Sequence, residues 1–205
     1  MATPSFPPVV LRNGVVVGDP LRAVAGLLKG PWHFDVGDPS RSAPFGEADV
    51  RLANQGGARI SAAEIAAVLE RRGAIERALE AIAPDASLAG EADSVPWLPL
   101  RQLFDTFAGI RGIGLAKMTK ALHPKRPALI PLLDSAVRKY LADDDPGAQA
   151  PFGERALQLV RGYKCDLDRN RQAVRAVRLE LTRRDSGITE VRILDLLILS
   201  AAAAA

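Results

Sequence analysis

The stretch that decides the fold is residues 107–140, FAGIRGIGLAKMTKALHPKRPALIPLLDSAVRKY. Leading into it, residues 97–110 carry apolar side chains three or four positions apart, which predicts a helix with one apolar face. Gly112 and Gly114 then indicate a tight turn, because glycine tolerates positive φ angles. Residues 115–122 predict a second helix, whose first-turn N–H groups lie beside this turn. Such a helix start suits an anion such as phosphate.

Positive charge is concentrated in the same stretch. From residue 111 to residue 139 there are seven basic residues and one acid, Asp134, so this part carries +6 whereas the whole chain carries +3. A concentrated basic face favours a polyanionic partner, and binding through it would weaken with salt. The basic residues are Arg111, Lys117, Lys120, Lys125, Arg126, Arg138 and Lys139.

The segment I110-R-G-I-G-L-A-K-M-T-K-A-L122 resembles the helix-hairpin-helix of the DNA glycosylase superfamily, whose pattern is L-P-G-[IV]-G. In that superfamily an Asp follows the second hairpin glycine by about twenty residues. Here Asp134 lies 20 positions after Gly114, in the context L133-D-S-A-V137. Residues 112–141 are also similar to an uncharacterised actinobacterial family related to these glycosylases.

The resemblance implies an all-α glycosylase-like domain over residues 1–205, with two lobes around a cleft and the hairpin plus Asp helix at 98–141. It implies that Asp134 is the catalytic carboxylate and double-stranded DNA the partner. No cofactor or metal ion is required, although the superfamily holds a monovalent cation at the hairpin carbonyls. The DNA-binding residues would be Arg111, Gly112, Ile113, Gly114, Lys117, Lys120, Lys125 and Arg126.

The hairpin departs from the superfamily pattern at two positions, and the second departure implies a monofunctional enzyme. Arg111 replaces the hairpin proline, and Ala116 stands where the glycosylase/lyases carry a Schiff-base lysine. Lys117 is one residue later, which rotates its side chain by about 100° around the helix. The expected chemistry is cleavage of an N-glycosidic bond after the base has left the stack. Asp134 would stabilise the oxocarbenium-like sugar or activate water.

Each of these residues also has a purely structural interpretation. Asp134 precedes a helix and can cap its first N–H groups. Gly112 and Gly114 can simply join two helices, and the basic side chains can be solvated surface residues. The alternatives are therefore a non-catalytic helix-hairpin-helix DNA-binding protein and an all-helical interaction protein whose basic face binds a protein or another polyanion.

Composition excludes several other classes. The 205 residues are 48% apolar and 25% charged, as in soluble globular proteins. A single cysteine, Cys165, leaves no disulfide within the chain and no cysteine-bound iron–sulfur cluster. His33 and His123, far apart in sequence, indicate neither a zinc site nor a Ser-His-Asp triad. Without a signal pattern or an apolar run of about 18 residues, we expect a cytoplasmic monomer with no membrane partner.

The remaining segments are predicted mainly as helices. Asn13-Gly14 between valine-rich runs predicts a small N-terminal β-hairpin. Ser61 and Glu64 form a capping-box pattern at a helix start, and the alanine run 201–205 is expected to be a frayed tail. Helices are predicted at 21–29, 47–54, 61–72, 74–82, 153–163, 169–183 and 188–200.

Three residues are candidates for the pocket that receives the base. Trp32 and Phe34 lie in a predicted loop, where an aromatic ring could stack on an extruded base. Gln55, near the start of a helix, resembles a Gln that some glycosylases insert into the duplex.

Overall fold

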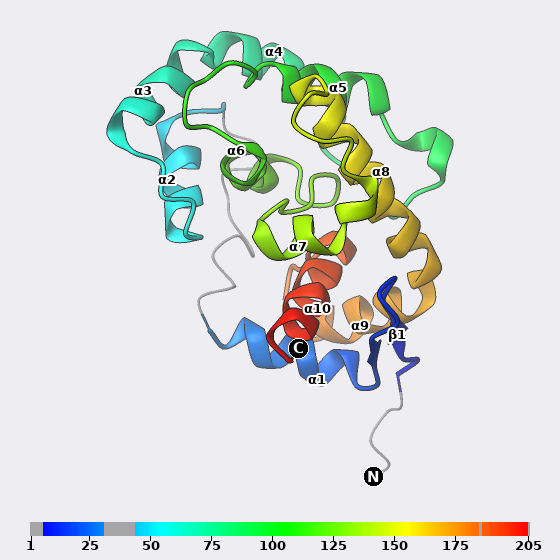
Figure 1. Cartoon of the computed structure of the whole chain (residues 1–205). Helices are drawn as coiled ribbons and strands as arrows, with labels where there is room; N and C mark the ends of the chain where they lie inside the picture. Colours follow the sequence, from blue (N-terminus) through cyan, green and yellow to red (C-terminus); the bar gives the residue numbers. More distant parts are fainter. Residues whose placement is uncertain (1–5, 31–43, 185, 205) are drawn as a thin grey trace.

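The computed structural model describes residues 6–30, 44–184 and 186–204. In this part of the chain the fold is mainly helical, with one small antiparallel sheet of strands β1 (Val9–Val10) and β2 (Val16–Val17), as predicted (Figure 1). The α-helices are α1 (Pro20–Leu28), α2 (Glu47–Gln55), α3 (Ala62–Glu70), α4 (Arg72–Glu80), α5 (Trp97–Asp105), α6 (Leu115–Leu122), α7 (Ser135–Tyr140), α8 (Phe152–Arg169), α9 (Arg171–Thr182) and α10 (Glu190–Ala204). Short 3₁₀ helices are η3 (Ala92–Ser94), η4 (His123–Lys125) and η5 (Ala142–Asp144).

The N-terminal β-hairpin turns at Asn13-Gly14, and Gly14 has a φ of 81° that the tight turn requires. The sheet is short, and a side chain from the far end of the chain supports it. Asn170 accepts a hydrogen bond from the N–H of Val10 at 2.8 Å and donates one to its carbonyl at 3.0 Å. Arg12 adds ion pairs to Asp144 and to Asp166. The hairpin is thus fixed to the junction of α8 and α9.

The capping box that begins α3 is confirmed. The Ser61 hydroxyl accepts from the Glu64 N–H at 3.3 Å, and the Glu64 carboxylate accepts from the Ser61 N–H at 2.8 Å. These reciprocal bonds satisfy two of the N–H groups that a helix start leaves open. They also fix the direction of the Glu64 side chain, which lies against Gly112 between α5 and α6.

Most helix boundaries lie within two residues of the predictions, and three helix ends differ by four to six residues. The first helix of the hairpin ends at Asp105, not at residue 110, because from Thr106 onward the N–H groups bond to carbonyls three residues back in a tighter turn. Helix α8 continues to Arg169, since its apolar face stays buried beyond residue 163. The predicted tail is wrong for residues 201–204, which extend α10. Alanine has the highest helix propensity, so the run prolongs the helix instead of fraying.

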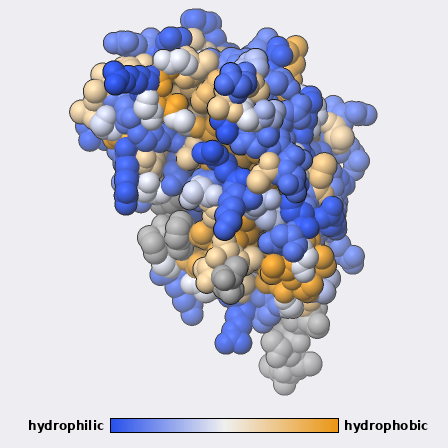
Figure 2. All heavy atoms as spheres, in the orientation of Figure 1, coloured by the Kyte–Doolittle hydropathy of each residue, from blue (hydrophilic) through white to orange (hydrophobic). Residues whose placement is uncertain are grey.

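One continuous apolar core joins the helices. Helix α10 lies in the lower half of the molecule with α1, α7 and α9 packed against it, while α5 packs on α8 and α2 packs on α6 (Figure 1). Figure 2 shows polar residues over most of this face and apolar ones gathered in its lower half. Within the described ranges, no helix combines the length and apolar character that crossing a membrane would need.

Candidate nucleic-acid interface and carboxylate site

The hairpin between α5 and α6 is anchored by two buried isoleucines and presents its glycines to solvent. Ile110 and Ile113 are buried, and the Ile113 N–H donates to the Ile110 carbonyl at 3.1 Å. Arg111, Gly112 and Gly114 are exposed. Gly114 is the N-cap of α6 and no side chain caps this helix start. The hairpin therefore offers helical N–H groups beside an exposed guanidinium, which is the arrangement expected of a phosphate site.

Glu64 of α3 lies directly against this hairpin. Gly112 has a φ of 81°, and a Cβ atom added there would collide with the Glu64 carboxylate. The same carboxylate accepts from the Lys117 ammonium at 2.7 Å and 2.8 Å. The hydrogen bond from Lys117 lowers the pKa of Glu64, together with the hydrogen bond from the backbone of Ser61. Lys117, a predicted DNA-binding residue, is thus ion-paired within the protein.

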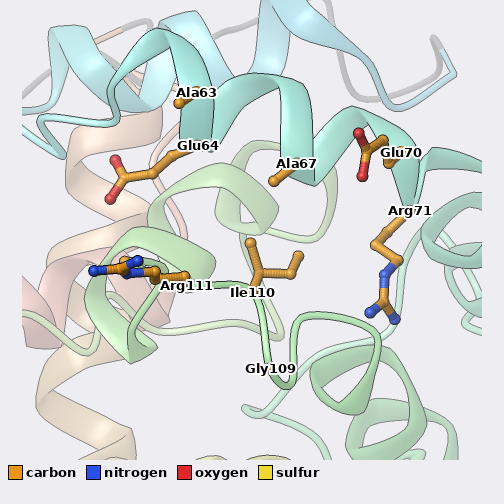
Figure 3. Close-up of a pocket in the computed structure, with 9 residues that line it drawn as sticks. Ala63, Glu64, Ala67, Glu70, Arg71, Gly109, Ile110 and Arg111 are labelled. Atoms are coloured by element: carbon orange, nitrogen blue, oxygen red, sulfur yellow. The ribbon is translucent and has the colours of Figure 1, made fainter.

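A cavity of about 480 Å³ opens between α3 and the hairpin (Figure 3). Figure 3 shows Ala67 and Ile110 near its centre, with the arginines Arg71 and Arg111 toward opposite ends. No hydrogen bond or ion pair joins either guanidinium to another described residue. No sequence pattern predicts this cavity, because α3 and the hairpin are far apart in the chain.

Lys120 lies one turn after Lys117 in α6. Its ammonium donates to the carbonyl of Gly56 at 2.9 Å, at the end of α2. Burial lowers the pKa of Lys120, and the charge of Asp134 partly opposes this shift. Lys120 is therefore a half-buried cation bound to the end of α2, in electrostatic contact with Asp134 but without an ion pair to it.

Asp134 is half-buried and caps α7. Its Oδ1 atom accepts from the N–H groups of Ala136 and Val137, at 2.9 Å and 3.0 Å. The predicted N-cap role is confirmed. Among the described residues, none forms a hydrogen bond with the second oxygen, Oδ2. The cap fixes the carboxylate through one oxygen and leaves the other for a further contact.

Lys125 and Arg126 are corrections to the predicted interface. Lys125 is 2% exposed, and its ammonium lies 2.8 Å from Asp49 of α2. Arg126 is 7% exposed and donates to the carbonyls of Leu79 at 2.8 Å and Ile82 at 2.9 Å. Both side chains turn inward at η4, where Arg126 satisfies carbonyls that the end of α4 leaves open. They hold helices together and do not present charge to a ligand.

The base-pocket candidates receive no support. Gln55 is exposed, but it ends α2 and does not begin a helix, so the predicted placement is wrong. Trp32 and Phe34 lie outside the described residues. In the part of the chain that the structure covers, no group of three or more His, Cys, Asp or Glu side chains is arranged to hold a metal ion.

Comparison with known proteins identifies a family that covers most of the chain. The model of a family described as a family of unknown function, DUF6308, matches residues 37–202, which include the hairpin, Asp134 and every helix except α1 and the end of α10. No curated protein and no solved structure matches the chain significantly. The chain belongs to the DUF6308 family.

Proposed function

We propose that this protein is a monofunctional DNA N-glycosylase with a two-lobed, glycosylase-like fold. The observation that carries the proposal is the state of the Asp134 carboxylate. It is half-buried, fixed by two peptide N–H groups through Oδ1, and has Oδ2 free of hydrogen bonds to the other described residues. It also stands 20 positions after a hairpin whose exposed helix start suits a phosphate.

The chemical step follows from this carboxylate. The base rotates out of the duplex, because the bond to the sugar is inaccessible within the stack. As the bond between C1′ and the base nitrogen breaks, the base leaves with the electron pair and the sugar gains positive charge. Oδ2 of Asp134 stabilises that charge or accepts a proton from water, whose oxygen forms the new bond to C1′. The proton from this water ends on the nitrogen of the departed base, so the products are the free base and an abasic site.

The hairpin supplies the grip on double-stranded DNA. The exposed N–H groups at the start of α6 bind one phosphate, with Arg111 beside it. Lys117 joins this contact when its ammonium binds the phosphate in addition to the Glu64 carboxylate or in place of it. Lys120 is assigned to the carboxylate and not to a phosphate, since it is half-buried near Asp134. The monovalent cation implied by the superfamily takes no part in this mechanism.

The enzyme is proposed to lack lyase activity. A Schiff-base lyase needs a lysine ammonium that can lose its proton near C1′. Ala116 occupies the corresponding position, and Lys117 is held by Glu64. The abasic site should therefore remain intact until alkali cleaves it.

The test is formation of abasic sites in a panel of duplexes: undamaged, alkylated, oxidised, deaminated, and phage DNA with modified cytosines. Wild type and Asp134→Asn are compared, with alkali revealing the sites. Asn is as good an N-cap as Asp, so the variant should fold normally and bind DNA. Base loss with wild type alone would support the proposal. Equal base loss with the variant would remove Asp134 from the mechanism.

The panel also decides the biological setting. Release of an alkylated, oxidised or deaminated base would indicate DNA repair. Release of a modified cytosine from phage DNA would indicate defence against phage.

A second candidate is a helix-hairpin-helix DNA-binding protein without catalysis. The observation that favours it is the cap, because accepting from Ala136 and Val137 already gives Asp134 a structural role. This candidate predicts salt-dependent duplex binding with no base loss anywhere in the panel.

A further inference from the structure

The two peptide groups that lead into Asp134 are held by side chains from two other helices. The Leu132 N–H donates to Oδ2 of Asp195 in α10 at 3.3 Å, and the Leu133 N–H donates to the hydroxyl of Thr119 in α6 at 3.0 Å. Leu132 and Leu133 are buried, so each N–H needs an acceptor within the protein. Both acceptors are side-chain oxygens, so neither hydrogen bond is part of a helix or sheet ladder.

Thr119 connects this segment to the beginning of the hairpin helix. It is 0% exposed, and its hydroxyl donates to the carbonyl of Leu115 at 3.0 Å while it accepts from Leu133. Leu115 is the first residue of α6 and follows the Gly114 cap. One hydroxyl therefore links the proposed phosphate-binding end of α6 to the peptide before Asp134.

Asp195 holds the neighbouring peptide. It is 3% exposed in α10, and its Oδ2 lies 4.0 Å from the Arg192 guanidinium. Burial raises the pKa of Asp195 to about 7. A buried carboxyl group is costly, whereas an apolar side chain would fill the space without that cost. An apolar residue could supply neither the acceptor for the Leu132 N–H nor the negative charge near Arg192.

We propose that Thr119 and Asp195 are positioning residues that set the Asp134 carboxylate relative to the phosphate-binding start of α6. Neither residue touches DNA. This inference rests on the proposed glycosylase function. A catalytic group displaced by roughly 1 Å can lose on the order of 100-fold in rate. Loss of either hydrogen bond should therefore weaken the stabilisation of positive charge on the sugar and leave phosphate binding unchanged.

The test uses a duplex in which a positively charged pyrrolidine replaces one deoxyribose ring. Its cation imitates the charge of the transition state, so a positioned carboxylate should bind it more tightly than an unmodified duplex of the same sequence. The quantity measured is the ratio of the two Kd values. Wild type should prefer the cationic duplex, and Asp134→Asn should lose the preference.

Thr119→Val removes the hydroxyl at nearly constant shape, and Thr119→Ser keeps it. We expect Thr119→Val to lose on the order of 10- to 100-fold of the preference while its Kd for the unmodified duplex stays at the wild-type value. Thr119→Ser should restore the preference. Asp195→Asn retains an acceptor for Leu132 and should behave like wild type, whereas Asp195→Leu should behave like Thr119→Val and provides an independent arm should the first variant fold poorly.

Two results would overturn the inference. One is that Thr119→Val and Asp195→Leu both prefer the cationic duplex as strongly as wild type does. The other is a loss of preference that accompanies an equal loss of binding to the unmodified duplex, because the ties would then serve folding alone. A wild-type protein that shows neither the preference nor base release would instead refute the glycosylase function.

Discussion

Glu64 and Lys117 form an ion pair that joins α3 to the hairpin helix, with the ammonium 2.7 Å and 2.8 Å from the two carboxylate oxygens. The carboxylate also lies against Gly112, where even a methyl group would collide with it. Under the proposed function, a DNA phosphate that approaches the hairpin must compete with Glu64 for Lys117. The pair would then connect the strength of DNA binding to a residue outside the hairpin motif.

Replacing Glu64 by Gln should strengthen DNA binding. The amide can still accept from the Ser61 N–H, so the cap of α3 survives, while Lys117 becomes available to a phosphate. One additional neutralised phosphate should steepen the salt dependence of the binding constant by about 0.9. Fluorescence anisotropy over a salt series measures this. Glu70→Gln, on the same helix, is the matched control, and an equal effect of both variants would refute the competition.

Lys125→Ala should destabilise the fold without changing the salt dependence of DNA binding. Lys125 and its partner Asp49 are each 2% exposed, so removing the cation leaves a buried carboxylate uncompensated. Breaking a buried pair in this way costs about 3–5 kcal/mol, which urea denaturation would reveal. Arg111→Ala is the contrasting variant, because its exposed side chain should affect DNA binding and not stability. Unchanged stability in Lys125→Ala would contradict the burial of this lysine.

The buried carboxyl group of Asp195 should make stability depend on pH. Burial raises its pKa to about 7 in the folded state, whereas an unfolded Asp titrates near ~3.9. Its contribution is therefore fully present below about pH 4 and is lost as pH rises to about 7. The difference is at most on the order of 4 kcal/mol. Denaturation at pH 5 and pH 8 would measure it for wild type and Asp195→Asn.

Asp195→Asn should have a free energy of unfolding that changes less between pH 5 and pH 8 than that of wild type. The part of the change that the Asp195 carboxyl group causes should be absent. Asn keeps the acceptor for the Leu132 N–H and has no proton to lose. An identical pH profile in wild type and the variant would mean that Asp195 does not titrate in this range.

Gly112→Ala should disturb the hairpin, whereas Gly114→Ala should not. Gly112 has a φ of 81°, and an alanine there costs about 1–2 kcal/mol in addition to the collision with Glu64. Gly114 has a φ of −96° and open space around its Cα. The melting temperature and the duplex affinity should both fall for Gly112→Ala. Equal tolerance of both alanines would show that the turn can rearrange.

The features that the sequence predicts well are set by neighbours in the chain. The φ of Gly112 follows from the hairpin turn itself, and the Asp134 carboxylate reaches N–H groups only two and three residues away. The Ser61 capping box is equally local. Such motifs carry their own partners, so a sequence pattern is sufficient to locate them.

The failures concern partners that lie far away in sequence. Lys125 and Arg126 look like surface cations until α2 and α4 supply Asp49 and the carbonyls of Leu79 and Ile82. Nothing in the sequence marks Thr119 either, because its hydroxyl accepts from the Leu133 N–H, which lies 14 residues later in the chain. Burial of a polar side chain is decided by tertiary packing, and a basic run does not reveal it.

The N-terminal hairpin and α1 lie outside the residues that the family model matches, yet they belong to the folding unit. Helix α1 packs against α10, and Asn170 secures β1 at Val10. A chain shortened to residues 37–202 would expose an apolar face of α10 to water and should aggregate. Residues 37–202 are therefore not a complete folding unit in this chain, because α10 packs against α1, which lies outside them.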